Sequence, residues 1–140
     1  MATVNGTNYT NSLDPSPETN QMAPGAWGGK VRVQIDTYEA VSIVDGTLIR
    51  IAKIPKGGHL IDVIVAHDAL GSGADLAVQT EDGSAEEIHA NADVDAAGQF
   101  QGVKVAFLGA KMTADTVIVL EVEAATINGT IATAVLYTTE

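Results

Sequence analysis

After residue 29, the chain alternates apolar and polar residues with a period of two, in short runs separated by turn residues. In the first run, the apolar residues Val31, Val33 and Ile35 alternate with polar ones. Successive side chains of an extended strand point to opposite faces, so this run predicts a strand whose apolar face is buried. A helical core would need apolar residues every three to four positions, and no long segment of the chain has that spacing.

The same reasoning predicts further strands along the chain. Glycine, proline and asparagine clusters mark the turns between them. Asn128 and Gly129 predict the tightest hairpin, because a type I′ turn needs positive φ at both of its central residues. Segment 84–97 is expected to form a helical turn or a long loop. The expected strands cover residues 38–44, 47–54, 60–66, 75–80, 102–108, 116–124 and 130–138.

Seven or eight short strands in a chain of 140 residues predict one all-β domain, an antiparallel β-sandwich. Residues 1–29 differ from the rest because they lack lysine, arginine and apolar periodicity and contain three prolines. We therefore divide the chain into an extended N-terminal arm, residues 1–29, and a β-sandwich domain, residues 30–140. Trp27 is expected to hold the arm to the domain. A merely floppy terminus is the alternative.

The charge balance excludes several classes of partner. The chain has 18 acidic against 7 basic residues, a net charge of −11, and therefore no basic footprint for nucleic acid or for an anionic membrane surface. No apolar run approaches the roughly 18 residues of a membrane span. The first residues have neither the basic nor the apolar region of a secretory signal. We predict neither a nucleic-acid nor a membrane partner.

Metal ligands are sparse. The chain has no cysteine, and its histidines are His59, His67 and His89. His59 and His67 are eight residues apart in one expected strand, on the same face but ~26 Å apart, which is too far for one ion. Calcium is the alternative, at loop carboxylates such as Glu81 with Asp82 or Asp93 with Asp95; a solvated acidic loop is the simpler interpretation.

No pattern indicates catalysis. The chain has no G-x-S-x-G turn, no phosphate-binding glycine loop and no cysteine nucleophile. We therefore assign no catalytic, cofactor-binding or metal residue, and we expect a protein that is not an enzyme and carries no cofactor.

The run IPKGGHLIDVIVAHDALGSGADLAVQTEDG, together with ATVNGTNYTNSLDPSP, GGKVRVQIDTYEA and NGTIATAVLYTTE, carries a resemblance across most of the chain. In these turn and strand patterns the protein resembles the capsid decoration (cement) proteins of tailed bacteriophages. The resemblance implies a jelly-roll-like sandwich that binds the major capsid protein on the outer capsid surface of the virion and stabilises the shell, as a homotrimer.

Two other functions stay open from the sequence. A head-fibre or tail-associated module that binds a receptor or glycan would show clustered aromatic residues, whereas the six aromatic residues here are scattered. A jelly-roll enzyme would carry a His-x-His metal motif, which the sequence lacks.

Overall fold

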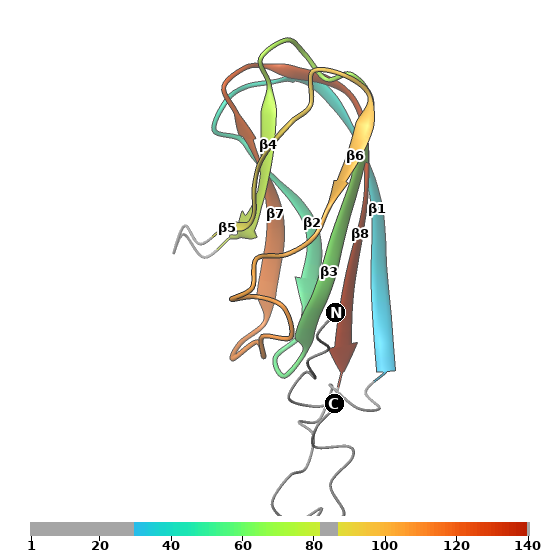
Figure 1. The fold of residues 1–140 in the computed structure, drawn as a ribbon, viewed down its shortest axis with the longest axis vertical. Helices are drawn as coiled ribbons and strands as arrows, with labels where there is room; N and C mark the ends of the chain where they lie inside the picture. Colours follow the sequence, from blue (N-terminus) through green and yellow to red (C-terminus); the bar gives the residue numbers. More distant parts are fainter. Residues whose placement is uncertain (1–29, 82–86, 140) are drawn as a thin grey trace, which may run out of the picture.

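A computed structural model describes residues 30–81 and 87–139, which form eight strands and no helix (Figure 1). The all-β prediction is confirmed. The strands are β1 (Lys30–Ile43), β2 (Leu48–Ile54), β3 (His59–His67), β4 (Asp75–Thr80), β5 (Glu87–Asp93), β6 (Gly98–Gln101), β7 (Thr116–Glu123) and β8 (Ile127–Thr139).

The strands form two four-stranded antiparallel sheets that face each other. Sheet A has the order β1-β8-β3-β6, and sheet B has the order β2-β7-β4-β5. The pairs are nested: β1 pairs with β8, β2 with β7, β3 with β6 and β4 with β5. This nesting is that of a hairpin rolled into two layers, so the fold is a jelly-roll-like antiparallel β-sandwich, as predicted.

The core lies between the two sheets. In β3 the buried residues Leu60, Val63 and Val65 alternate with half-buried ones, and in β7 Ile118 and Leu120 are fully buried. Each such side chain contributes about 1.5–3 kcal/mol to folding by leaving water. Met112, in the segment between β6 and β7, belongs to the same core cluster.

The predicted burial of β1 is wrong. The strand forms and extends to Ile43, but Val31, Val33 and Ile35 are 61%, 52% and 75% exposed. The face of β1 that points toward sheet B carries the polar residues instead. This is possible because β1 is the edge strand of sheet A and lies beyond most of the core. Its apolar residues therefore line the outer face of the sandwich. Alternation specifies two faces without specifying which one is buried.

The predicted hairpin at Asn128 and Gly129 is also wrong. Both residues lie inside β8, and β7 and β8 belong to different sheets. The Asn128 side chain accepts a hydrogen bond from the Ser42 backbone N–H at 2.8 Å. A Cβ on Gly129 would lie 3.0 Å from Leu70 Cδ2, and φ at Gly129 is 130°. Asn128 and Gly129 therefore allow close packing of β8 against Ser42 and Leu70, within a strand and not in a turn.

Two segments differ from their predicted structure. Residues 87–93, expected as a helical turn or loop, form β5, in which Ile88 alone is fully buried, so the sequence lacks a clear alternation. Residues 102–108, expected as a strand, form a turn segment after the four-residue β6. Backbone hydrogen bonds nevertheless hold this segment, from Lys104 N to Ile88 O at 2.7 Å and from Gly109 N to Leu60 O at 2.6 Å.

The N-terminal arm and Trp27 lie outside the described residues, so the division into arm and domain stays a prediction; the first described strand begins at Lys30. Across residues 30–81 and 87–139, no helix is long and apolar enough to cross a membrane.

Candidate interaction surface

The three histidines contact backbone carbonyls of the sandwich. A register shift between Leu60 and Asp62 adds a residue to β3, so His59 and His67 face opposite sides of sheet A, which corrects the expectation that they share a face. The shift reverses the alternation that the spacing alone implies. In each ring Nδ1 lies at hydrogen-bond distance from a backbone carbonyl: that of Gly109 at 2.8 Å for His59, that of Asp68 at 2.9 Å for His67 and that of Ala90 at 2.6 Å for His89.

The candidate calcium carboxylates also have structural roles. Glu81 forms an ion pair with Arg50, and Asp93 Oδ1 accepts the Asp95 backbone N–H at 2.9 Å, which closes the turn after β5. Asp82 lies outside the described residues. Among the residues that the structure describes, no group of three or more His, Cys, Asp or Glu side chains could hold a metal ion.

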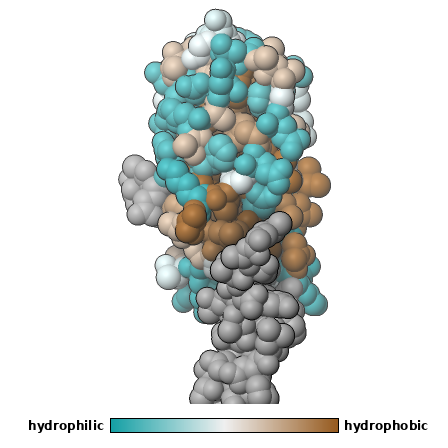
Figure 2. All heavy atoms as spheres, viewed as in Figure 1, coloured by the Kyte–Doolittle hydropathy of each residue, from teal (hydrophilic) through white to brown (hydrophobic). Residues whose placement is uncertain are grey.

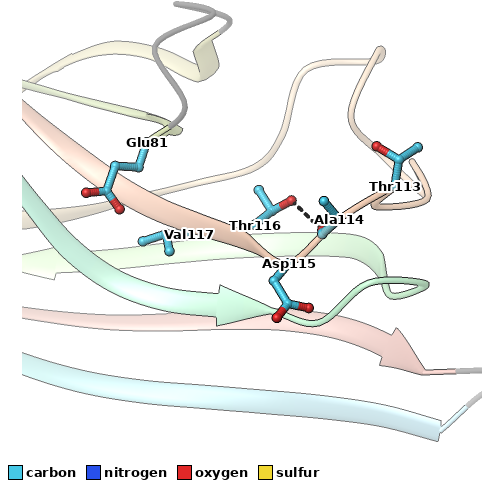
Figure 3. Close-up of a pocket in the computed structure, with 6 residues that line it drawn as sticks. All are labelled: Glu81, Thr113, Ala114, Asp115, Thr116 and Val117. Carbon is cyan, nitrogen blue, oxygen red and sulfur yellow. Dashed lines mark hydrogen bonds between the residues drawn. The ribbon is translucent and has the colours of Figure 1, made fainter.

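The hollow drawn in Figure 3 lies beside the start of β7. Glu81 and residues 113–117 line it. Asp115 accepts the Lys56 backbone N–H at 2.9 Å and lies 3.5 Å from Lys53 Nζ, and these two contacts, in this order, hold the pKa of Asp115 below its usual value. Thr116 Oγ1 donates to the Ala114 carbonyl at 3.0 Å. Glu81, Asp115 and Thr116 therefore bind other parts of the chain, and these contacts include no nucleophile–base pair.

The outer face of sheet B is acidic. Glu121 and Glu123 project from β7, and Glu87 and Asp45 lie near enough to interact with Glu121. Desolvation raises the pKa of Glu121, and the negative charges of Glu123, Glu87 and Asp45 raise it further. Asn91 donates a hydrogen bond to Glu123. The negative charges of this face repel acidic partners.

The outer face of sheet A is apolar. Besides the three exposed residues of β1, it carries side chains from β3 and β8 that alternate with buried ones, among them Ile64 and Leu136. We call this surface the apolar face; its members are Val31, Val33, Ile35, Ile64, Ala134 and Leu136. Figure 2 shows hydrophobic residues along the margin of the molecule where β1 lies in Figure 1 and across its lower half.

The sequence carries a signal for the apolar face that alternation alone does not reveal. Residues 60–66, LIDVIVA, are apolar at six of their seven positions. A strand in contact with water on one face should alternate, so a nearly continuous apolar run indicates apolar groups on both faces. An exposed apolar face of this kind is typical of sites that bind another protein, a membrane or a ligand.

One end of the sandwich carries acidic residues and no basic ones. The loops that join β1 to β2, β3 to β4, β5 to β6 and β7 to β8 lie at one end, at the top in Figure 1. Acidic residues at or beside these loops include Asp45, Asp68, Asp93, Asp95 and Glu123, and the loops contain no lysine or arginine. The basic residues lie in β1, in β2, in the turn after β2 and in the segment between β6 and β7: Lys30, Arg32, Arg50, Lys53, Lys56, Lys104 and Lys111.

No protein-family model and no curated protein sequence matches the chain. Three solved structures have the same fold. A chain of the Cyanophage Pam1 capsid asymmetric unit is 20% identical, with 91% of this chain and 99% of that chain covered and a TM-score of 0.71. A chain of the capsid of Ralstonia phage GP4 is 19% identical, with coverage of 86% and 92% and a TM-score of 0.67.

A chain of the acidic stable capsid structure of Helicobacter pylori bacteriophage KHP30 is 16% identical, with coverage of 79% and 90% and a TM-score of 0.62. Identities this low establish a shared fold. Because each match covers at least 90% of the other chain, the likeness extends over nearly all of three chains of similar size, and it is not confined to one domain of larger proteins.

Proposed function

We propose that the protein is a structural component of a tailed-phage virion, a decoration or cement protein that binds the outer surface of the major capsid shell and stabilises it. The observation that carries the proposal is the match of the whole sandwich to chains of three phage capsid structures. A protein that binds an assembled shell and not its separated subunits shifts the equilibrium toward the shell by mass action. That role requires surface that is buried against the shell, and it requires no catalytic group.

The surfaces of the sandwich suit this role. The apolar face offers side chains that gain free energy when a neighbour covers them, at about 25 cal/mol per Å² of apolar area. The acidic face of sheet B and the acidic loop end suit contact with water. We expect the apolar face to lie against a protein neighbour in the virion and the acidic face of sheet B to stay solvated. The major capsid protein is the proposed partner.

We further propose that the protein acts as a homotrimer. A small sandwich has open sheet edges, and oligomerisation is one way to cover them. Light scattering on the purified protein measures the mass in solution, and a mass of three chains is expected either there or on the shell. A protein that stays monomeric in both settings would remove the proposed threefold contact.

The alternative, a receptor- or glycan-binding module of a fibre or tail, gains no support from the described residues. Phe100 and Phe107 pack against the core, Tyr137 is buried, and Tyr38 is 36% exposed. These side chains form no exposed aromatic platform of the kind that sugars stack on.

Quantitative mass spectrometry of purified virions tests the proposal. The copy number of this chain is measured relative to the major capsid protein in the same particles. A decoration protein should be present in hundreds of copies per virion. A dozen copies or fewer would place the chain in a tail, fibre or vertex and would contradict the proposal.

A further inference from the structure

We propose that β1 is a self-pairing edge: β1 of one copy pairs antiparallel with β1 of a second copy, with Gln34 opposite Gln34, so that two four-stranded sheets become one sheet of eight strands. The inference rests on the edge of sheet A and on its charge pattern, and it does not depend on the proposed function.

β1 differs from the other three edge strands. On sheet A, β6 has only four residues. On sheet B, the pairing of β5 with β4 shifts register twice, and the pairing of β2 with β7 shifts once. β1 pairs with β8 without interruption from Lys30 to Ala40. A long, regular edge with exposed apolar residues is the type of strand that accepts another strand.

The hydrogen bonds of β3 identify which backbone groups of β1 face the open edge. Gly102 N donates to Val63 O on the β6 side of β3, so Val63 does not exchange hydrogen bonds with its β8 partner Val135. The groups of Val135 therefore face Gln34, and the even-numbered residues of β1 bond to β8. Thr37 agrees with this assignment, because its backbone N–H donates to Asp36 Oδ1 at 2.8 Å.

It follows that the N–H and C=O groups of Val31, Val33 and Ile35 point to the open edge. In a strand pair centred on Gln34, Val33 of one copy lies opposite Ile35 of the other, and these two residues exchange backbone hydrogen bonds. Both residues are more than half exposed in the single chain. The pairing therefore satisfies edge groups and covers apolar surface on the same side of the sheet.

Charge favours this register. The same centring places Arg32 of each copy opposite Asp36 of the other, in the non-hydrogen-bonded positions where side chains approach most closely. Centring on Arg32 or on Asp36 would instead place two like charges face to face. Within residues 30–81 and 87–139, Arg32 and Asp36 form no ion pair with another side chain. Each is therefore available for a cross-strand pair, and a two-fold axis generates the contact twice.

The test uses native mass spectrometry of the purified chain over a range of concentrations. We expect assemblies with even numbers of chains. If the protein is otherwise a trimer, the β1 pairing should join two trimers into a hexamer. Arg32→Asp and Asp36→Arg each place like charges across the two-fold axis, and each should raise the dissociation constant of the pairing by at least about tenfold. The double variant, Arg32→Asp with Asp36→Arg, restores opposite charges and should restore the pairing. Its failure to do so, in a protein with a normal β-sheet circular-dichroism spectrum, would overturn the proposal.

A disulfide test checks the register itself, since the chain has no cysteine. Arg32→Cys and Asp36→Cys proteins are mixed under mild oxidation. The mixed pair places the two cysteines opposite each other and keeps one intact pair of Arg32 with Asp36, so we expect a disulfide-linked heterodimer. Neither variant alone should cross-link efficiently. Equal cross-linking of the mixture and of each single variant would contradict the register. Odd-numbered assemblies alone, at every concentration, would contradict the pairing.

Discussion

Gly129 lies where β8 passes closest to the loop after β3. Its φ of 130° disfavours any residue with a side chain, and a Cβ would approach Leu70 Cδ2 to 3.0 Å and Asp68 Cβ to 3.4 Å. We expect Gly129→Ala to lower the free energy of unfolding by about 1–3 kcal/mol, measured by urea denaturation. Gly46→Ala is the matched control: its φ is 88° with nothing within 4 Å of the added Cβ, so it should cost only the backbone strain, about 1 kcal/mol. Equal losses in the two variants would show that the Leu70 contact does not matter.

Glu121 gives the fold a pH dependence with a definite sign. Because folding raises its pKa through desolvation and neighbouring carboxylates, the folded state binds its proton more tightly than the unfolded state does. The charged form therefore destabilises the fold above the folded pKa, and this penalty is relieved as the pH falls through that value. We expect Glu121→Gln to raise the melting temperature at pH 7 and to give a smaller gain at pH 4. Glu39→Gln, on exposed β1, is the control and should show no such pH-dependent difference. A gain from Glu121→Gln that is the same at both pH values would show that the charge of Glu121 is not the cause.

At the scale of elements, Gln34 connects the two sheets at their shared edge. Its side chain donates to the Lys53 carbonyl at 2.5 Å and accepts the Lys53 backbone N–H at 3.0 Å, so it takes the place of a neighbouring strand beside β2. Gln34→Ala removes these two hydrogen bonds and the one that Gln34 Nε2 donates to the Tyr137 hydroxyl at 3.2 Å, and we expect a loss of about 1–3 kcal/mol in the free energy of unfolding. Gln99→Ala, at an exposed position of β6, should change it by less than about 0.5 kcal/mol. An equally small effect of Gln34→Ala would mean that water replaces the Gln34 contacts at no cost.

Proteolysis tests the boundary between arm and domain. Residues 1–29 contain no lysine or arginine, so the first tryptic site is after Lys30. If the arm is accessible, trypsin should cut there first and leave a folded body from Val31 onward. Lys104 and Lys111 lie outside the eight strands, but backbone hydrogen bonds hold their segment to Ile88 and Leu60, so cleavage there should be slower. Mass spectrometry of a time course distinguishes the two orders. Earlier cleavage after Lys104 would show that this segment opens more readily than the arm boundary.

The strands of the core could be predicted from sequence because burial and alternation coincide in them. In β2 the alternating residues Ile49 and Ile51 are also buried, and in β7 the apolar run supplies the buried residues. The expected ranges of both strands match to within one or two residues. β5 could not be found, because an edge strand with one fully buried side chain is held mainly by its backbone pairing to β4. The hairpin prediction at Asn128 and Gly129 was wrong because this dipeptide, which suits a tight turn, also suits a close packing contact within a strand. The apolar face was missed because alternation in β1 does not tell which sheet face meets the core.

At the scale of the whole molecule, the sandwich has one apolar and one acidic outer face. Under the proposed function, this asymmetry predicts which side faces the capsid shell. We expect Ile64→Lys, on β3 in the centre of the apolar face, to weaken attachment to capsids by about tenfold or more, measured by co-sedimentation of the purified protein with capsids that lack it. Leu48→Lys makes the same change on sheet B opposite Glu121, and it should leave attachment unchanged. A stronger effect of Leu48→Lys than of Ile64→Lys would show that the shell contact lies on sheet B and not on the apolar face.

Cryo-electron microscopy of the intact virion is the most direct test of the decoration role. We predict density for an eight-stranded sandwich on the outer surface of the shell, repeated over the capsid lattice and grouped in threes. In that density the apolar face of sheet A should lie against a protein neighbour, and the acidic face of sheet B should meet solvent. Density for the chain confined to the tail or a single vertex, or located inside the shell, would contradict the proposed decoration role.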